Sequence, residues 1–207
     1  SITGFGQTGP YAERLGYDFI IQALSGIMDL TGEPDGEPQK MGVAFADIFT
    51  GLYGVIAIQS ALKVREYSQK GQHIDLSLMD SMVAVLANQA SNYFVSRKSP
   101  KRMGNKHPNI VPYQVFQVKN GHLIIAVGNN EQFERFCKVI GLDYLYSSEE
   151  YNNNQKRVQN REKLVEIITS KTKQYNKNDL KSLLEENNVP VGSVNDIEEV
   201  FNDPQVK

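Results

Sequence analysis

The sequence predicts an α/β fold with helices and strands in both halves of the chain. Three observations indicate this class. Residues 45–67 are apolar nearly all round for most of their length, which is typical of a buried helix. Residues 73–78 alternate polar and apolar side chains, as a half-buried strand does. Residues 113–127 have the pattern of a β-hairpin.

The elements of the first half follow in order. Residues 17–30 have helical apolar spacing and run into a segment rich in Gly and Pro. The helix 45–67 comes next, and we expect it to be mostly buried. The strand 73–78 leads into a further helix, residues 80–94.

A change of composition separates the two halves. Residues 96–109 are basic, rich in Pro, Gly and Asn, and lack apolar periodicity, which indicates a linker or a functional loop. We therefore predict a first domain over residues 1–95, a linker and active-site loop over residues 96–112, and a small α/β domain over residues 113–207.

The small domain opens with the hairpin. Strands 113–118 and 122–127 flank Asn120 and Gly121, a pair that accepts positive φ at both turn positions. The pattern then predicts three helices and a strand, at residues 131–140, 160–174, 179–186 and 190–194.

Composition excludes several classes of protein. The chain of 207 residues is 40% hydrophobic and 22% charged, which argues against disorder, collagen and coiled coil. Its net charge of −2, with Lys and Arg spread along the chain, gives no basic surface for nucleic acid. No apolar run approaches the roughly 18 residues that a membrane span needs, and no signal peptide is recognisable.

Cys137 is the single cysteine, which excludes a disulfide within the chain and a zinc site built on cysteines. We predict a core position for it and a reducing compartment, the cytoplasm. The three histidines are dispersed, so we predict no metal site. Since the chain begins at Ser1 without Met and ends in a turn, we expect an internal fragment.

Asp47 is a lone carboxylate within the apolar segment that opens the helix 45–67. A buried charge is costly unless it is paired or hydrogen-bonded, so its presence needs a reason. One interpretation is that Asp47 caps the helix or interacts with its dipole. The other is that the helix N-terminus keeps the carboxylate ionised and ready to attack an acyl group.

Seven motifs occur in order along the chain. They are Gly4-Phe-Gly-Gln-Thr-Gly-Pro, Gly16-Tyr-Asp-Phe-Ile, Gly32-Glu-Pro-Asp-Gly, Ala46-Asp-Ile-Phe-Thr-Gly-Leu-Tyr, Gly71-Gln-His-Ile-Asp, Gly104-Asn-Lys-His-Pro and Pro190-Val-Gly. Together they resemble the class III CoA-transferases, typified by formyl-CoA and carnitine CoA-transferases. The resemblance implies a Rossmann-like large domain followed by a smaller α/β domain, and an intertwined homodimer.

The resemblance also implies a chemistry. The residue that matches Asp47 attacks the thioester of an acyl-CoA, giving a mixed anhydride and then an aspartyl-CoA thioester, from which an acceptor carboxylate takes CoA. Coenzyme A is thus a substrate, a small carboxylate is the acceptor, and no metal or redox cofactor is implied. Much of the CoA pocket is expected upstream of Ser1. The motifs leave the acyl group and the acceptor open.

Tyr17 separates two activities within the family. On pattern alone it is a core-facing aromatic residue at a helix start. The family's racemases carry a His where this chain has Tyr17, and a tyrosine with a pKa of about 10 is a poor base at neutral pH. Tyr17 therefore favours a transferase over the alternative, an acyl-CoA racemase or isomerase. A second alternative is a CoA-binding subunit without catalytic activity, against which Asp47 argues.

The loop from Arg102 onward is expected to lie over the active site, as the resemblance implies. Gly104 would let the backbone approach the thioester, and Arg102, Lys106 or His107 would meet a carboxylate. We include Asn105 among the predicted binding residues because it lies in the same motif. The alternatives are a solvated linker and, for His107, a turn residue before proline.

Overall fold

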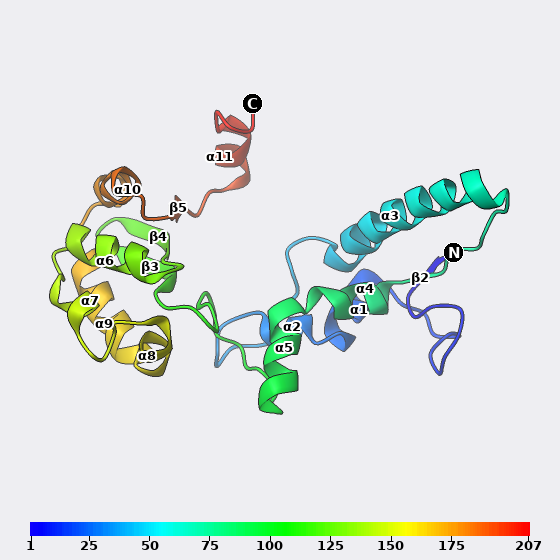
Figure 1. Cartoon of the computed structure of the whole chain (residues 1–207), viewed down its shortest axis with the longest axis horizontal. Coiled ribbons are helices and arrows are strands. Elements are labelled where there is room, and N and C mark those ends of the chain that lie inside the picture. Colours follow the sequence, from blue (N-terminus) through cyan, green and yellow to red (C-terminus); the bar gives the residue numbers. More distant parts are fainter. The chain divides into compact units, whose positions relative to one another are not determined.

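The computed structural model describes residues 1–207, which form two compact units, Ser1–Gly104 and Asn105–Lys207 (Figure 1). Each unit combines a small sheet with several helices, so the predicted α/β class is confirmed. The division falls between Gly104 and Asn105, within the segment 96–112 that was predicted as linker.

The first unit is built on two short parallel strands, β1 (Ile2–Thr3) and β2 (Leu76–Ser77). Its helices are α1 (Asp18–Leu24), α2 (Ile27–Leu30), α3 (Phe45–Ser68), α4 (Leu78–Val85) and α5 (Ala87–Ser96). Its core is small and consists of Ile21, Ala46, Leu78 and Met82, with half-buried neighbours around them.

Three predicted elements of this unit differ in the structure. The helix 17–30 breaks into α1 and α2 at Gly26, whose φ of 88° is left-handed. The helix 80–94 breaks into α4 and α5 near Ala87, whose φ is 47°. The strand 73–78 is reduced to β2 because the Ser77 side chain accepts a hydrogen bond from Asp80 N and starts α4.

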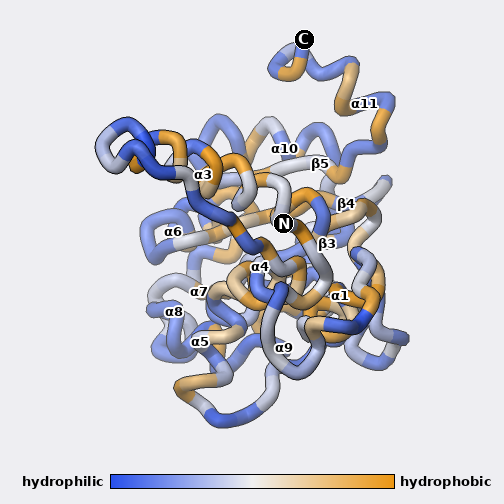
Figure 2. Tube along the Cα trace, turned by 90° about the vertical axis from the view of Figure 1, so that its right-hand side faces the viewer, coloured by the Kyte–Doolittle hydropathy of each residue, from blue (hydrophilic) through white to orange (hydrophobic).

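The bounds of α3 agree with the prediction, but its predicted burial is wrong. Only Ala46, Thr50 and Gly54 are buried, along one narrow stripe. The opposite side leaves Leu52 and other aliphatic side chains exposed. In Figure 2 several stretches of the tube along α3 have the orange colour of hydrophobic residues. By length and composition α3 could cross a membrane. The expectation that no apolar run approaches such a length is therefore corrected for α3. Gly, Thr, Ser and Gln interrupt its apolar runs in the sequence, but its mean hydropathy is still high enough for a span.

Two glycines bring the first loop against the start of α1. A Cβ atom at Gly4 would lie 2.6 Å from the Gly16 Cα atom, and one at Gly16 would lie 2.7 Å from the Gly4 Cα atom. Both distances are shorter than real Cβ contacts, so neither position accepts a side chain without movement of the backbone. The two motifs that contain these glycines are thus joined in space.

The second unit has a three-stranded antiparallel sheet in the order β3 (Tyr113–Val118), β4 (Gly121–Ala126) and β5 (Val191–Ser193). Its helices are α6 (Asn130–Val139), α7 (Tyr144–Ser147), α8 (Asn154–Gln159), α9 (Arg161–Thr172), α10 (Lys177–Glu186) and α11 (Ile197–Asn202). A single large core joins the sheet to α6, α9 and α10, with Phe116, Ile125, Phe133, Phe136, Leu164 and Leu184 among its members.

The hairpin between β3 and β4 is confirmed, but only Gly121 has a positive φ there, at 145°. Asn120 instead accepts a hydrogen bond from Lys177 N through its Oδ1 atom, at 2.7 Å. Helices α7, α8 and α11 were not predicted, because they are short. The capping box of Asp196 and Glu199 is the sequence signal that α11 offered.

Cys137 is fully buried in this core, as predicted. Burial raises the pKa of its thiol from 9.0 to about 12, which keeps the sulfur protonated at neutral pH.

Candidate active site

Asp47 lies in the first turn of α3 and its side chain is exposed. The N-terminal end of a helix carries partial positive charge, so an acidic residue is common at this position. The carboxylate makes no hydrogen bond or ion pair, and the N-cap residue is Ala44, which has no capping side chain. The side chain is therefore free to meet another molecule.

The cap of α3 comes from another helix. Asp18, the first residue of α1, accepts a hydrogen bond from Ala46 N through its Oδ1 atom at 2.8 Å. This satisfies one of the N–H groups that every helix start leaves unpaired. The carboxylate that caps α3 is thus that of Asp18. Asp47, which follows Ala46 in the chain, does not cap the helix.

Tyr17 is the N-cap residue of α1 and is 73% exposed, so the core-facing alternative is wrong. Tyr17 precedes Asp18 and Asp47 follows Ala46. Two residues that are distant in the sequence thus flank the hydrogen bond that joins the starts of α1 and α3.

Arg102 is bound to its own unit. Its Nη1 atom lies 2.9 Å from Asp29 Oδ1, and its other donors reach the carbonyl oxygens of Asp29, Glu33 and Gly36. Four of its five N–H groups are accounted for in this way. Gly104 has a φ of 59° and donates from its N–H to Gly32 O at 3.0 Å. The structure brings neither residue to Asp47, and their roles toward a substrate stay predictions.

Asn105 and His107 belong to the second unit. Asn105 is exposed, while His107 is half-buried, donates from its N–H to Tyr113 O and accepts from Asn109 N at Nδ1. Burial, followed by the nearby Arg161 cation, lowers the pKa of His107, so the neutral imidazole is favoured at pH 7. The contacts of His107 are those of a turn residue before proline. The binding roles predicted for Asn105 and His107 stay predictions.

Two buried arginines that the sequence analysis did not single out hold the loop after His107. Arg157 donates to Val111 O, Tyr151 O and Asn130 Oδ1, and its guanidinium lies 4.4 Å from the Phe133 ring. Burial lowers its pKa to about 10. Arg161 donates to Pro108 O at 2.9 Å. Their i, i+4 spacing was the signal that the sequence offered.

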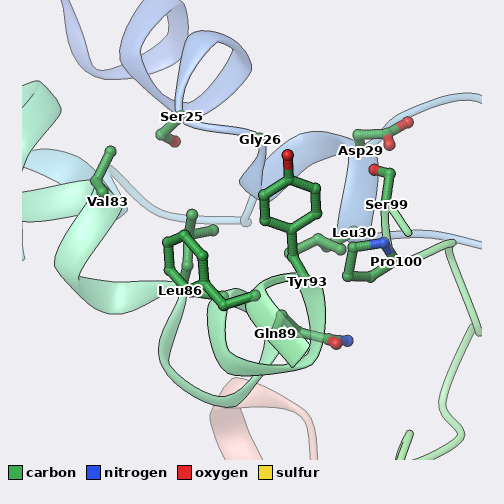
Figure 3. A pocket seen from close by; sticks show the side chains of 12 residues that line it. Ser25, Gly26, Asp29, Leu30, Val83, Leu86, Gln89, Tyr93, Ser99 and Pro100 are labelled. Carbon is green, nitrogen blue, oxygen red and sulfur yellow. The ribbon is translucent and has the colours of Figure 1, made fainter. Parts of the chain in front are cut away.

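Asp47 does not line either of the two main cavities of the first unit. One, of about 250 Å³, is lined mostly by apolar side chains, with Tyr93, Leu86, Leu30 and Pro100 around it in Figure 3. The other, of about 340 Å³, lies between α3 and α4 and includes Asp75 and Asp80. No group of three or more His, Cys, Asp or Glu side chains could hold a metal ion.

The fold and the site together define a two-unit α/β chain with an unpaired aspartate at a helix N-terminus. The chain belongs to CoA-transferase family III, whose family model matches residues 1–207. This confirms the resemblance that the seven motifs indicated.

The chain spans about half the length of the curated relatives it matches. It is 53% identical over 207 residues to a protein of Agrobacterium fabrum named succinate–glutarate CoA-transferase, covering 100% of this chain and 52% of the relative. It is 43% identical to a mouse protein named succinyl-CoA:glutarate CoA-transferase, covering 100% of this chain and 47% of the relative.

Solved structures agree in fold. A CAIB/BAIF family protein from Brucella suis is 58% identical, with a TM-score of 0.81 over 100% of this chain and 55% of that one. A protein from M. tuberculosis is only 20% identical but has a TM-score of 0.86 over 99% of this chain and 53% of that one. The second likeness concerns the fold alone.

Proposed function

We propose that the full-length protein is a class III CoA-transferase that moves CoA from an acyl-CoA donor to a small carboxylic acid, with Asp47 as the nucleophile. The observation that carries the proposal is the state of Asp47. Its carboxylate is exposed and unpaired at the start of α3, and the cap of that helix is provided by Asp18. Family membership supplies the reaction class.

The first half of the proposed reaction transfers CoA to the enzyme. An Asp47 oxygen attacks the thioester carbonyl carbon of the donor, the C–S bond breaks, and CoA leaves as a thiolate. The thiolate then attacks the side-chain carbonyl carbon of Asp47 in the mixed anhydride. This step releases the donor's carboxylate and leaves an aspartyl-CoA thioester.

The second half repeats these steps with the acceptor. Its carboxylate attacks the aspartyl thioester, CoA thiolate leaves, and the thiolate attacks the acceptor's acyl carbon. The new acyl-CoA forms and Asp47 returns to a carboxylate. No electron is transferred in these steps, so they need no redox cofactor, and we propose that the reaction also proceeds without a metal ion.

Succinyl-CoA is the donor and a dicarboxylate such as glutarate the acceptor that we propose to test first, because the relatives at 53% and 43% identity are named for these compounds. We further propose a soluble cytoplasmic enzyme that works as an intertwined homodimer. The apolar outer side of α3 supports this assembly, since an exposed apolar surface of that kind marks an interaction site.

The experiment uses the full-length protein incubated with succinyl-CoA and then treated with hydroxylamine or borohydride. Mass spectrometry is expected to locate the trapped modification at Asp47. Replacing the nucleophile, Asp47→Ala or Asp47→Asn, is expected to abolish the adduct and to lower kcat by about a thousandfold or more. Glu131→Gln is the matched control, because Glu131 is an exposed acidic residue in the first turn of α6 and lies outside the seven motifs, and its turnover should be that of the wild type.

Wild-type turnover by Asp47→Ala, or an adduct on another residue, would contradict the transferase mechanism. The racemase or isomerase alternative is tested in the same reaction by exchange of the α-proton of the acyl group with solvent deuterium. Exchange without transfer of CoA would favour that alternative, and binding of CoA without either reaction would favour a non-catalytic subunit.

A further inference from the structure

Gln22 is a glutamine whose side chain is completely buried in α1, one turn after Asp18. Its Nε2 atom donates to Asp18 Oδ2 at 2.8 Å and, at a longer 3.4 Å, to Val43 O. Its Oε1 atom accepts from Met41 N at 2.9 Å. The carboxamide is therefore bonded on both of its ends, to α1 and to the segment that leads into α3.

These partners allow only one orientation of the amide group. Asp18 and Val43 offer acceptors, so they must face the NH₂ group, and the Met41 N–H is a donor, so it must face the oxygen. A buried amide with fixed partners on both ends holds them at a fixed separation, because moving either leaves a buried polar group unpaired.

Gln22 is connected to Asp47 by two further steps. It holds one oxygen of Asp18, and the other oxygen of Asp18 accepts the hydrogen bond from Ala46 N. Gln22 also holds the backbone at Met41 and Val43, just before α3 begins. Both the cap of α3 and the chain that enters it thus depend on one side chain.

We propose that Gln22 is a positioning residue for the reaction, which fixes the first turn of α3 and so the direction of the Asp47 carboxylate. The inference rests on the proposed function of Asp47. Gln22 contacts neither Asp47 nor, by its burial, any substrate, so its influence is transmitted through Asp18 and Ala46.

Two substitutions separate positioning from simple filling of space. Gln22→Leu removes all three hydrogen bonds at similar volume. Gln22→Glu keeps the shape and adds an ionisable group: when protonated, the introduced glutamate can donate to Asp18 and accept from Met41 N. When ionised, it repels Asp18 and cannot donate. The introduced carboxyl is buried beside a carboxylate, so its pKa is raised and the positioning is retained at acid pH and lost as pH rises.

Asp18 is the ionisable group hydrogen-bonded to Gln22. The acidic groups on the neighbouring helices are Asp29 of α2, Asp47 of α3 and Asp80 of α4, all exposed. Two cations lie on the same side of the unit: Arg102 is paired with Asp29, and the Lys40 ammonium group donates to Met41 O. Among these charged groups only Asp18 is hydrogen-bonded to the Gln22 side chain, and its carboxylate disfavours ionisation of the introduced glutamate.

The test follows the rate of adduct formation at Asp47, and KM for succinyl-CoA, in the full-length protein between pH 5.5 and 9. With Gln22→Leu we expect the rate to fall by about 10- to 100-fold at every pH, since a shift of about 1 Å in a reacting group is sufficient for such a loss. With Gln22→Glu we expect a rate near that of the wild type at pH 5.5 and a decline of tenfold or more toward pH 9. KM should stay within about threefold in both.

Gln155→Glu and Gln155→Leu are the matched controls, because Gln155 is exposed on α8 and makes no hydrogen bond through its side chain. Their profiles should match the wild type. Amide hydrogen exchange over residues 41–47, measured in the same preparations and compared with the wild type at each pH, is expected to accelerate in Gln22→Leu throughout and in Gln22→Glu only toward pH 9. An unchanged pH profile for Gln22→Glu, or unchanged exchange over residues 41–47, overturns the proposal.

If the proposed function of Asp47 is wrong, the results differ from those expected if only the role of Gln22 is wrong. If the wild type forms no adduct at Asp47, the nucleophile assignment fails, and with it the catalytic meaning of Gln22. Exchange over residues 41–47 then still reports whether Gln22 holds this segment. If exchange accelerates while the adduct rate keeps its normal pH profile, Gln22 is structural and the positioning role is rejected.

Discussion

Among single residues, the pair Asp18 and Asp47 shows why an acidic residue at a helix start is ambiguous in sequence. The helix dipole favours a carboxylate there whether it caps the helix or reacts. In the structure the two roles are divided, because Asp18 accepts the Ala46 N–H from the neighbouring helix and Asp47 makes no bond. A cap contributed from 28 residues away in the sequence has no local signal.

Cys137 provides a prediction at the same scale. Burial raises its pKa from 9.0 to about 12, so the native state keeps the proton to higher pH than the unfolded state. The thiol's contribution to stability is fully present below about pH 9 and is lost as pH rises toward 12, by about 1.4 kcal/mol per pH unit within that window. We expect the wild type to lose stability above pH 9 more steeply than Cys137→Ala.

Urea unfolding of both full-length proteins between pH 7.5 and 10.5 measures this difference. Other titrating groups are common to the two proteins and cancel in the comparison. Cys137→Ala is expected to be less stable at neutral pH, since it leaves a small cavity. Parallel decline of the two stabilities above pH 9 would show that Cys137 does not titrate as described.

At the scale of elements, the first loop and the start of α1 approach each other through Gly4 and Gly16. Neither glycine is needed for its own backbone conformation, since neither has a positive φ. They are needed because two backbones meet without room for a side chain. The loop thereby fixes the start of α1, where Tyr17 and Asp18 lie.

Gly16→Ala tests this contact. The added Cβ atom would lie 2.7 Å from the Gly4 Cα atom, so the backbone must shift, and we expect a loss of about 1–3 kcal/mol in the free energy of unfolding. Activity should fall as well, because α1 carries the cap of α3. Gly71→Ala is the control, since nothing lies within 4 Å of its added atom. Equal unfolding midpoints of the two variants would contradict the close approach.

At the scale of the whole molecule, α3 presents an apolar side that this chain leaves exposed. The chain spans about half the length of its relatives, such as the one from Agrobacterium fabrum. Apolar surface of this extent is stable in water only when something covers it. We expect the rest of the full-length protein, or a second copy, to cover this side of α3.

Leu52→Lys in the full-length protein tests whether the apolar side of α3 is covered. Leu52 is 54% exposed in this chain, and if it is covered in the whole protein the introduced lysine buries a charge and costs about 2–4 kcal/mol. Tyr67→Lys, at the charged end of α3, should change stability by less than about 0.5 kcal/mol. The two variants are compared by chemical unfolding, and a neutral Leu52→Lys would indicate that this side faces water in the whole protein.

Sequence patterns predicted those parts of the fold that depend on neighbouring residues. The bounds of α3, the β3–β4 hairpin and the end of α6 at Gly141 follow from local spacing and turn chemistry, and the structure agrees. The breaks at Gly26 and Ala87 did not follow, because one or two backbone angles interrupt a helix without disturbing its apolar period.

By itself, then, the sequence determined the α/β class, the two-part organisation, the family and the candidate nucleophile Asp47. Only the tertiary structure decided that Asp18 caps α3, that Gln22 holds the segment before it, and that Arg157 and Arg161 hold the loop after His107. The physical reason is that these bonds join groups far apart along the chain. Each residue satisfies a buried polar group of another element, and no periodicity records such a pairing.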